Sequence, residues 1–270
     1  MRSAGNASNA GGAHGISGAG LQILALSKHF GPLAALADVS LQLAEGERVA
    51  VIGPNGAGKT SLFNLLTGVL RPDSGRVLLD GRDLTGLPPW RCARHGLGRS
   101  FQISSNFASL SVEDNLRVAA LRAAGLAEGL GSIWRRVRGD PQLRDRVEDA
   151  LAAVGLGDRR TIAAAALSYA EQRTLELGMV LAGAPRVLLL DEPTAGMNRA
   201  EAAAMTDLIS RVCAGRGLLL IEHDMNMVFG IAQRIAVLER GRLLALDTPE
   251  KIRADGRVRS IYLGAETTPC

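Results

Sequence analysis

An octapeptide at Gly53–Thr60 has the residue pattern of a phosphate-binding loop. It reads GPNGAGKT and fits G-x-x-x-x-G-K-[ST]. The apolar run Arg48–Ile52 precedes it and a helix-forming segment at 61–67 follows it, which is the strand–loop–helix context that this motif requires. Glycines let backbone N–H groups face phosphate oxygens, and a helix N-terminus adds a favourable dipole. We therefore predict a nucleoside triphosphate site, with a simple glycine-rich turn as the structural alternative.

Two side chains of this loop have separate chemical roles. Lys59 would reach the β- and γ-phosphates, and the Thr60 hydroxyl would bind Mg²⁺. The residues that we predict to contact nucleotide here are Gly53, Pro54, Asn55, Gly56, Ala57, Gly58, Lys59, Thr60 and Ser61.

A second motif places two acids directly after an aliphatic run. Val187–Leu190 is followed by Asp191 and Glu192, and then by Pro193. A buried strand would deliver Asp191 to the carboxyl edge of a sheet, where open α/β folds bind ligands. Asp191 would then hold Mg²⁺, and Glu192 could polarise an attacking water. A polar strand end that leads into a turn is the alternative, and the phosphate loop favours the functional interpretation.

The elements that must position these residues alternate between strands and helices, which indicates a layered α/β fold. The expected strands lie at Leu21–Leu26, Leu41–Leu43, Arg48–Ile52, Arg76–Leu79, Val187–Leu190, Leu218–Ile221, Ile235–Leu238 and Leu243–Leu246. The strand signal disappears from about Ser111 to Ala166, where the sequence predicts an inserted helical subdomain. A helix is expected to begin after Thr248, since Pro249 and Glu250 suit its first turn.

Composition limits the class of protein. The 270 residues carry 31 basic and 27 acidic side chains, and 47% are hydrophobic, so we expect a folded globular chain. The small, interspersed charge does not favour a nucleic-acid partner. The three cysteines lack metal-ligand spacing and are expected to be reduced thiols. No run approaches the roughly 18–20 apolar residues of a membrane span.

A third motif gives the set its family resemblance. Leu167–Arg173 reads LSYAEQR and, together with the two motifs above, resembles the signature of ABC-type ATPases. The resemblance runs from Leu21 to Gly264. Other family positions are matched by Phe30, Gln102, His223 and the Ala195–Asn198 loop.

The resemblance implies an α/β P-loop NTPase (ABC ATPase) core, an N-terminal antiparallel β subdomain and an inserted helical subdomain at about 105–168. It implies domain limits of 21–264. The first 20 residues are rich in Gly, Ala, Ser and Asn, so we expect a disordered tail at 1–20, and residues 265–270 are expected to form a short tail. It also implies ATP and Mg²⁺ as cofactors. Each ATP site would combine one subunit's phosphate loop with the other subunit's signature in a head-to-tail dimer.

Residue roles follow from the same resemblance. Glu192 would be the general base, and His223 would contact the γ-phosphate. Gln102 would sense the γ-phosphate and join Thr60 and Asp191 at the metal. Phe30 would stack on adenine, and Ser168 and Ala170 would contact the partner's nucleotide.

Two departures from the family pattern stand out. The family signature usually carries two glycines where this chain has Tyr169 and Ala170, and commonly Gln where it has Glu171. Asn198 stands where many relatives have Asp. Ser168-x-x-Glu171 is itself a capping box, so the segment should still open a helix and present N–H groups.

The phosphate-loop region 52–68, the segment Gly98–Gln102 and Ile221–Met225 resemble the ATPase of branched-chain amino-acid uptake systems. The implied partners are a second ATPase subunit (identical or paralogous), two membrane-spanning permease subunits and, indirectly, a solute-binding protein. The implied location is peripheral, on the cytoplasmic face of the inner membrane. Urea or amide import, and a soluble ABC ATPase acting as a scaffold, are the alternatives. A P-loop kinase or GTPase would not explain Leu167–Arg173 or His223.

Overall fold

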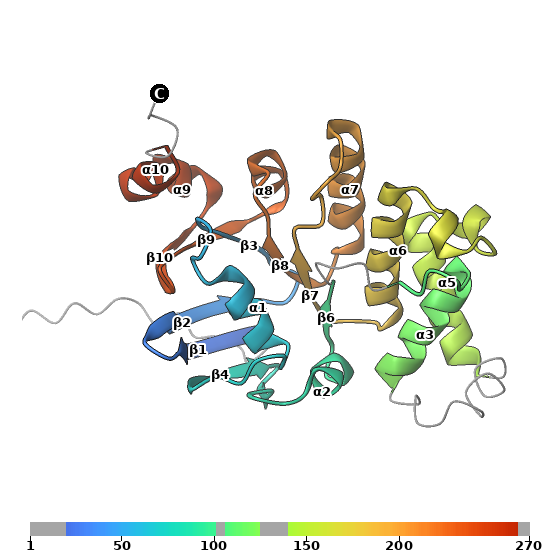
Figure 1. The fold of residues 1–270 in the computed structure, drawn as a ribbon, viewed down its shortest axis with the longest axis horizontal. Helices are drawn as coiled ribbons and strands as arrows, with labels where there is room; N and C mark the ends of the chain where they lie inside the picture. The colour runs from blue at the N-terminus through green and yellow to red at the C-terminus, as the bar shows by residue number, and fades with distance from the viewer. Residues whose placement is uncertain (1–19, 101–105, 125–139, 264–270) are drawn as a thin grey trace, which may run out of the picture.

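The computed structural model describes residues 20–100, 106–124 and 140–263. Two sheets and a group of helices organise this part of the chain (Figure 1). The tails expected at 1–20 and 265–270 fall almost entirely outside the described residues, and so does Gln102. Within the described residues, no helix is long and apolar enough to cross a membrane.

The central sheet has the strand order β10-β9-β3-β8-β7-β6. Its strands are β3 (Arg48–Ile52), β6 (Leu97–Arg99), β7 (Val187–Asp191), β8 (Gly217–Ile221), β9 (Arg234–Glu239) and β10 (Arg242–Asp247). The neighbours from β9 to β6 pair in parallel, and β10 adds an antiparallel edge. Every residue of β7 and β8 is buried, which confirms the prediction of strands covered on both faces.

A second, antiparallel sheet has the order β2-β1-β4-β5 and confirms the expected N-terminal β subdomain. It consists of β1 (Leu21–Phe30), β2 (Leu33–Leu43), β4 (Ser74–Leu79) and β5 (Arg82–Asp83). Helix α1 (Lys59–Leu66) lies between the two sheets (Figure 1). Its Phe63 is fully buried in a core that includes Ile23 of β1 and Leu219 of β8. This core fixes the phosphate loop relative to both sheets.

A layer of helices lies beside β6 and β7 of the central sheet (Figure 1). It includes α3 (Val112–Ala124), α5 (Pro141–Val154) and α6 (Tyr169–Ala182), which pack against one another. Asp140 caps α5 by accepting N–H groups of its first turn, and Pro141 takes the first helical position. Helix α2 (Pro89–Arg94) lies beside α3, and 3-10 turns at Gly157–Arg159 and Ala164–Ala166 complete the layer.

The remaining helices are α7 (Arg199–Val212), α8 (Met225–Ile231), α9 (Pro249–Ala254) and α10 (Gly256–Leu263). The predicted start of α9 is confirmed, with Thr248 as N-cap and Pro249 in the first turn. The hairpin between β9 and β10 turns at Arg240 and Gly241, which both have positive φ. Positive φ at both central residues matches the twist of the flanking strands.

Candidate active site

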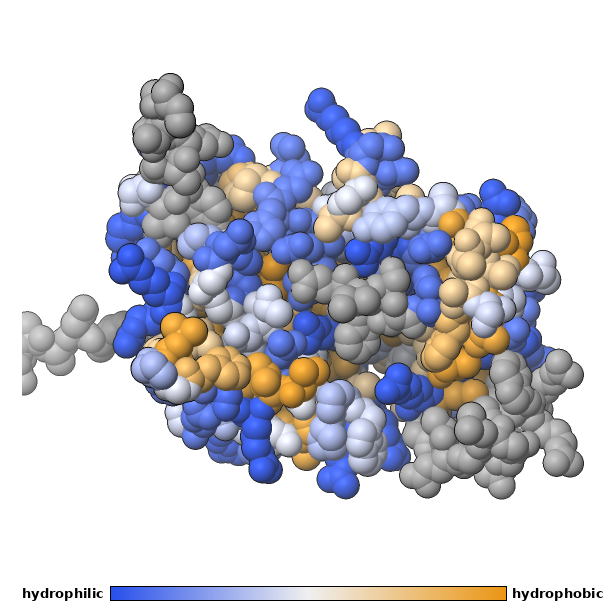
Figure 2. All heavy atoms as spheres, in the orientation of Figure 1, coloured by the Kyte–Doolittle hydropathy of each residue, from blue (hydrophilic) through white to orange (hydrophobic). Residues whose placement is uncertain are grey.

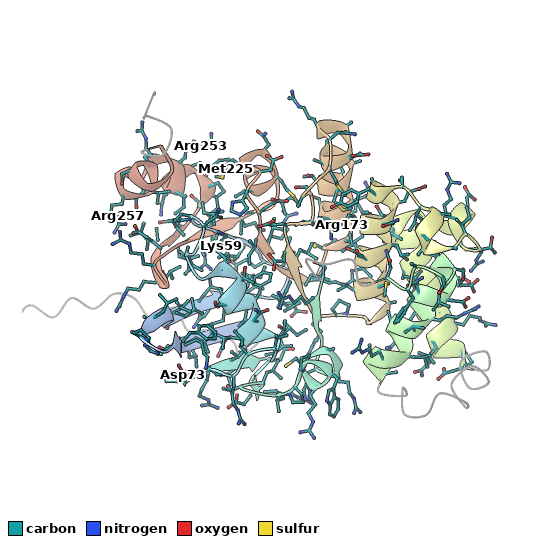
Figure 3. The ribbon with its side chains drawn as sticks, viewed as in Figure 1. Lys59, Asp73, Arg173, Met225, Arg253 and Arg257 are labelled. Atoms are coloured by element: carbon teal, nitrogen blue, oxygen red, sulfur yellow. The ribbon has the colours of Figure 1, made fainter. Side chains whose placement is uncertain are left out.

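Three adjacent parallel strands end in register at one edge of the central sheet. Val51 of β3 pairs with Ile221 of β8, and Ile221 pairs with Asp191 of β7. The loops that leave these strands therefore begin side by side, at the edge where open α/β sheets bind ligands. They carry the phosphate loop, Glu192 and His223. Figure 3 shows Lys59 at the N-terminal end of α1, next to this sheet.

The phosphate loop is folded tightly around the ammonium group of Lys59. Lys59 is 8% exposed, and its Nζ donates to the carbonyl oxygens of Gly53 at 2.6 Å and Pro54 at 3.1 Å. An ammonium has three donors, so these bonds leave one for a phosphate oxygen. Burial lowers the pKa of Lys59, and the charges of Glu192 and Asp191 oppose that shift. Lys59, which is predicted to bind phosphate, therefore lies within electrostatic reach of both acids.

Two glycines of the loop are required by close backbone contacts. A Cβ at Gly53 would lie 2.3 Å from the carbonyl oxygen of Leu238, and one at Gly58 would lie 2.5 Å from that of Ala35. Gly58 also has a φ of 101°. The loop is thus held between β9 and β2, while its Pro54–Gly56 segment and Thr60 remain exposed.

The structure brings Glu192 and His223 together. Oε1 of Glu192 lies 3.1 Å from Nε2 of His223, and both side chains are partly exposed. Glu192 has a φ of 49°, which is uncommon for a residue with a side chain, and its N–H donates to the carbonyl oxygen of Ile221 at 2.8 Å. Strained backbone of this kind is frequent at functional sites. The Glu192 carboxylate can accept a proton from a water molecule, and His223 lies within hydrogen-bonding distance of that carboxylate.

Glu222 is a buried acid that the sequence analysis missed. It is 4% exposed, and its carboxylate accepts hydrogen bonds from both loops of the site. One oxygen accepts from the Thr194 N–H at 3.2 Å and from the Thr194 hydroxyl. The other accepts from the N–H groups of His223 at 2.7 Å and Asp224 at 3.4 Å. Glu222 therefore fixes the His223 loop to the loop that follows Glu192. An acid at the end of an aliphatic strand, beside His223, was the available signal.

We expect Glu222→Gln to lower kcat for ATP hydrolysis by roughly 10-fold, because it loosens both loops and small displacements of reacting groups are costly. In either orientation the amide NH₂ leaves a buried backbone N–H without an acceptor, which should cost about 1–3 kcal/mol of unfolding free energy. Steady-state hydrolysis and urea denaturation measure the two effects. Glu45→Gln, at an exposed site, is the control. Unchanged kcat and stability would contradict this role.

Asp191 is held by a buried arginine that the sequence analysis did not single out. Arg99 Nη2 lies 3.4 Å from Asp191 Oδ2, and the two side chains are 10% and 1% exposed. Arg99 Nη1 donates to Asn64 Oδ1 at 2.6 Å and to Thr67 Oγ1 at 3.1 Å. Desolvation raises the pKa of Asp191, and the Arg99 charge opposes that rise. Arg99 thus joins β6, α1 and the predicted metal ligand.

The signature segment begins α6 as predicted. Ser168 is the N-cap: its Oγ accepts from the Glu171 N–H, and the Glu171 carboxylate accepts from the Ser168 N–H, which confirms the capping box. Ser168 is exposed and Ala170 is half-buried, so this helix end is accessible to a second subunit. Asn198 likewise caps α7, and its Oδ1 accepts from the N–H groups of Ala200 and Glu201.

Ala170→Gly should leave ATP hydrolysis within several-fold of wild type. Ala170 lies in the first turn of α6 and has negative φ, so it already presents its N–H as a glycine would. The substitution should cost up to about 1 kcal/mol of helix stability. Steady-state hydrolysis and thermal unfolding check both expectations. A complete loss of hydrolysis would show that our interpretation of this segment is wrong.

Phe30 lies at the end of β1 and is 48% exposed. Lys28 Nζ lies 5.7 Å from the centre of its ring and 2.7 Å from Asp73 Oδ1. One ring face is therefore near a cation, and the exposed ring is available for the predicted stacking on adenine.

The chain matches the family described as ABC transporter over residues 36–195. This chain belongs to the ABC transporter family. It is 41% identical over 248 residues to the high-affinity branched-chain amino acid transport ATP-binding protein LivG of Salmonella typhimurium strain LT2, which covers 90% of this chain and 97% of LivG. It is 38% identical to BraF of Pseudomonas aeruginosa PAO1, a protein of the same description, with the same coverage.

A solved structure of this family has the same fold. It is the ADP conformation of MJ1267, an ATP-binding cassette of an ABC transporter, with a TM-score of 0.79 and 26% identity over 91% of this chain and 98% of that one. These findings confirm the family resemblance, the α/β P-loop fold and the assignment as an ATPase subunit of a transporter.

Proposed function

We propose that this ABC ATPase is bound peripherally at the cytoplasmic face of the membrane. There it hydrolyses ATP to drive the import of branched-chain or other hydrophobic amino acids. The observation that carries the proposal is the 41% identity to LivG, which extends over 90% of this chain and 97% of LivG. The Lys59 loop and the Glu192–His223 pair supply the chemistry that such a subunit needs.

The residues at the carboxyl edge of the central sheet fit ATP and Mg²⁺. The unused donor of Lys59 suits a phosphate oxygen, and the exposed Thr60 hydroxyl and the Asp191 carboxylate are oxygen ligands of the kind that Mg²⁺ prefers. Bound Mg²⁺ would neutralise charge on the β- and γ-phosphates. Gln102 is a third proposed ligand, outside the described residues.

Hydrolysis would then use the Glu192–His223 pair. Glu192 takes a proton from the water whose oxygen attacks the γ-phosphorus, and the bond from that phosphorus to the β–γ bridging oxygen breaks to release ADP. Lys59 stabilises negative charge on the phosphates, and His223 Nε2, 3.1 Å from Glu192 Oε1, holds the carboxylate in place. In a head-to-tail dimer, the α6 N-terminus with Ser168 and Ala170 would complete the partner's site.

A groove beside α6 fits a permease segment. It has a volume of about 430 Å³ and is lined by residues of α2, β6, α3 and α6. Its rim carries three exposed apolar side chains, Val69, Trp90 and Phe107. Figure 2 shows hydrophobic side chains at the surface of the helical layer that includes α3. Ser100, the last described residue before the segment that contains Gln102, also lines the groove.

A pull-down of the tagged protein from its native membranes in mild detergent, followed by mass spectrometry, tests the function. We expect two multi-span proteins and a solute-binding protein, and the ligand of the latter names the substrate. Trp90→Glu should lose the multi-span partners, whereas the matched Trp90→Phe should keep them. Exclusively soluble partners would favour the scaffold alternative, and a binding protein for urea or amides would correct the substrate class.

A further inference from the structure

The side chain of Tyr169 connects α6 to the loop that follows Glu192. Tyr169 is the first residue of α6, and its hydroxyl donates to the carbonyl oxygen of Ala195 at 2.8 Å. Ala195 belongs to the segment 193–197, which lies between Glu192 and Asn198, the N-cap of α7. A phenol thus occupies a signature position where the family pattern has glycine, and it spans the boundary between the helical layer and the central sheet.

Arg173 fixes the direction of this hydrogen bond. Its Nε and Nη2 lie 3.1 Å and 3.0 Å from the Tyr169 oxygen and donate to it, and its Nη1 pairs with the buried Glu176 at 2.9 Å. Figure 3 shows Arg173 on the side of α6 that faces α7. Because the phenol oxygen accepts two donors, its own proton is directed to Ala195. Hydrogen bonds in such a chain polarise one another.

The loop is shaped to receive the ring. Gly196 has a φ of 78°, and a Cβ there would lie 3.0 Å from the Tyr169 hydroxyl. The loop is also tightly turned, since the Ala195 N–H donates to the carbonyl oxygen of Glu192 and the Met197 N–H to that of Thr194, both at 3.1 Å. A shift of Ala195 is therefore passed directly to Glu192.

We propose that Tyr169 is a positioning residue that couples α6, the helix that begins in the signature segment, to Glu192 of the same chain. Since the proposed function places Ser168 at the partner's nucleotide, this hydroxyl links the two ATP sites of the dimer. When the partner's nucleotide moves the N-terminus of α6, Ala195 moves with it. This movement places the Glu192 carboxylate where it can accept a proton from the attacking water. Without the hydroxyl, the N-terminus of α6 and the loop at Ala195 move independently.

Tyr169→Phe removes this hydroxyl and no other atom. The chain has two tyrosines, so Tyr262→Phe is the matched control. We expect Tyr169→Phe to lower kcat about five-fold, the population change that one net hydrogen bond supports, and to bring the Hill coefficient for ATP toward one. The affinity for a non-hydrolysable ATP analogue and the Tm should stay close to wild type. Arg173→Lys, which keeps the charge beside Glu176 but loses the paired donors, should give a smaller loss, and the double variant should be no worse than Tyr169→Phe.

Hydrogen exchange without nucleotide tests the link independently of hydrolysis. Tyr169→Phe should speed exchange in peptides covering 168–172 and 193–198 together, whereas Tyr262→Phe should not. Unchanged exchange, or unchanged kcat and Hill coefficient in a variant of an active protein, overturns the coupling. Parallel loss of analogue affinity, Tm and kcat would show a merely structural role and also overturns it. A wild-type protein without ATPase activity would instead refute the proposed function.

Discussion

Glu192→Gln should lower the rate of ATP hydrolysis by about 10²–10⁴-fold, the usual contribution of a positioned general base. The amide keeps the shape of the side chain and cannot take a proton from water. Its carbonyl oxygen can still lie beside His223 Nε2, where the Glu192 oxygen is found at 3.1 Å. ATP binding should be retained, because the phosphate contacts come from the Lys59 loop. Single-turnover hydrolysis and equilibrium binding of a fluorescent ATP analogue separate the two properties.

The same variant should accumulate an ATP-bound dimer, which size-exclusion chromatography with ATP and Mg²⁺ detects. In the proposed dimer, ATP binding would close the interface and hydrolysis would reopen it, so blocking the chemical step should trap the closed state. Glu45→Gln, an exposed substitution, should hydrolyse ATP at the wild-type rate. A loss smaller than 10-fold in Glu192→Gln would mean that another group is the base.

Arg99→Met should destabilise the folded protein by about 3–5 kcal/mol, the cost of leaving a buried carboxylate without its partner. Asp191 is 1% exposed, and Arg99 supplies the positive charge that opposes its desolvation. The substitution also removes the hydrogen bonds to Asn64 and Thr67. Urea denaturation of the nucleotide-free protein measures the change.

The destabilisation should depend on pH in a defined direction. Burial already raises the folded-state pKa of Asp191, and removal of Arg99 raises it further. The folded variant then binds a proton more tightly than the unfolded chain does, so its deficit is greatest at high pH and shrinks as the pH falls through the folded-state pKa. We expect a smaller difference from wild type at acidic pH than at pH 8. Asp191→Asn in the Arg99→Met background should recover much of the stability. Equal losses at both pH values would contradict this account.

Local sequence determined the parts of the site whose geometry is made by neighbouring residues. The phosphate loop, the strand that ends at Asp191 and the capping box at Ser168 each lie within one strand–turn–helix unit or one helix start. Their backbone N–H groups, glycines and caps are set by adjacent positions, so spacing alone predicts them. β6 was missed because it has three residues, one of which is Gly98, and its strand conformation comes from pairing with β7.

Tertiary structure decided the contacts that join these units. Glu222 with Thr194, Arg99 with Asp191, and Tyr169 with Ala195 link residues 26 to 92 positions apart. A side chain's partner across such a distance depends on strand order and helix packing, which no local pattern encodes. The sequence thus determined which groups could bind and cleave ATP. The packing of the helical layer on the central sheet decided which side chains hold those groups in place, because a hydrogen bond is fixed only when both of its ends are.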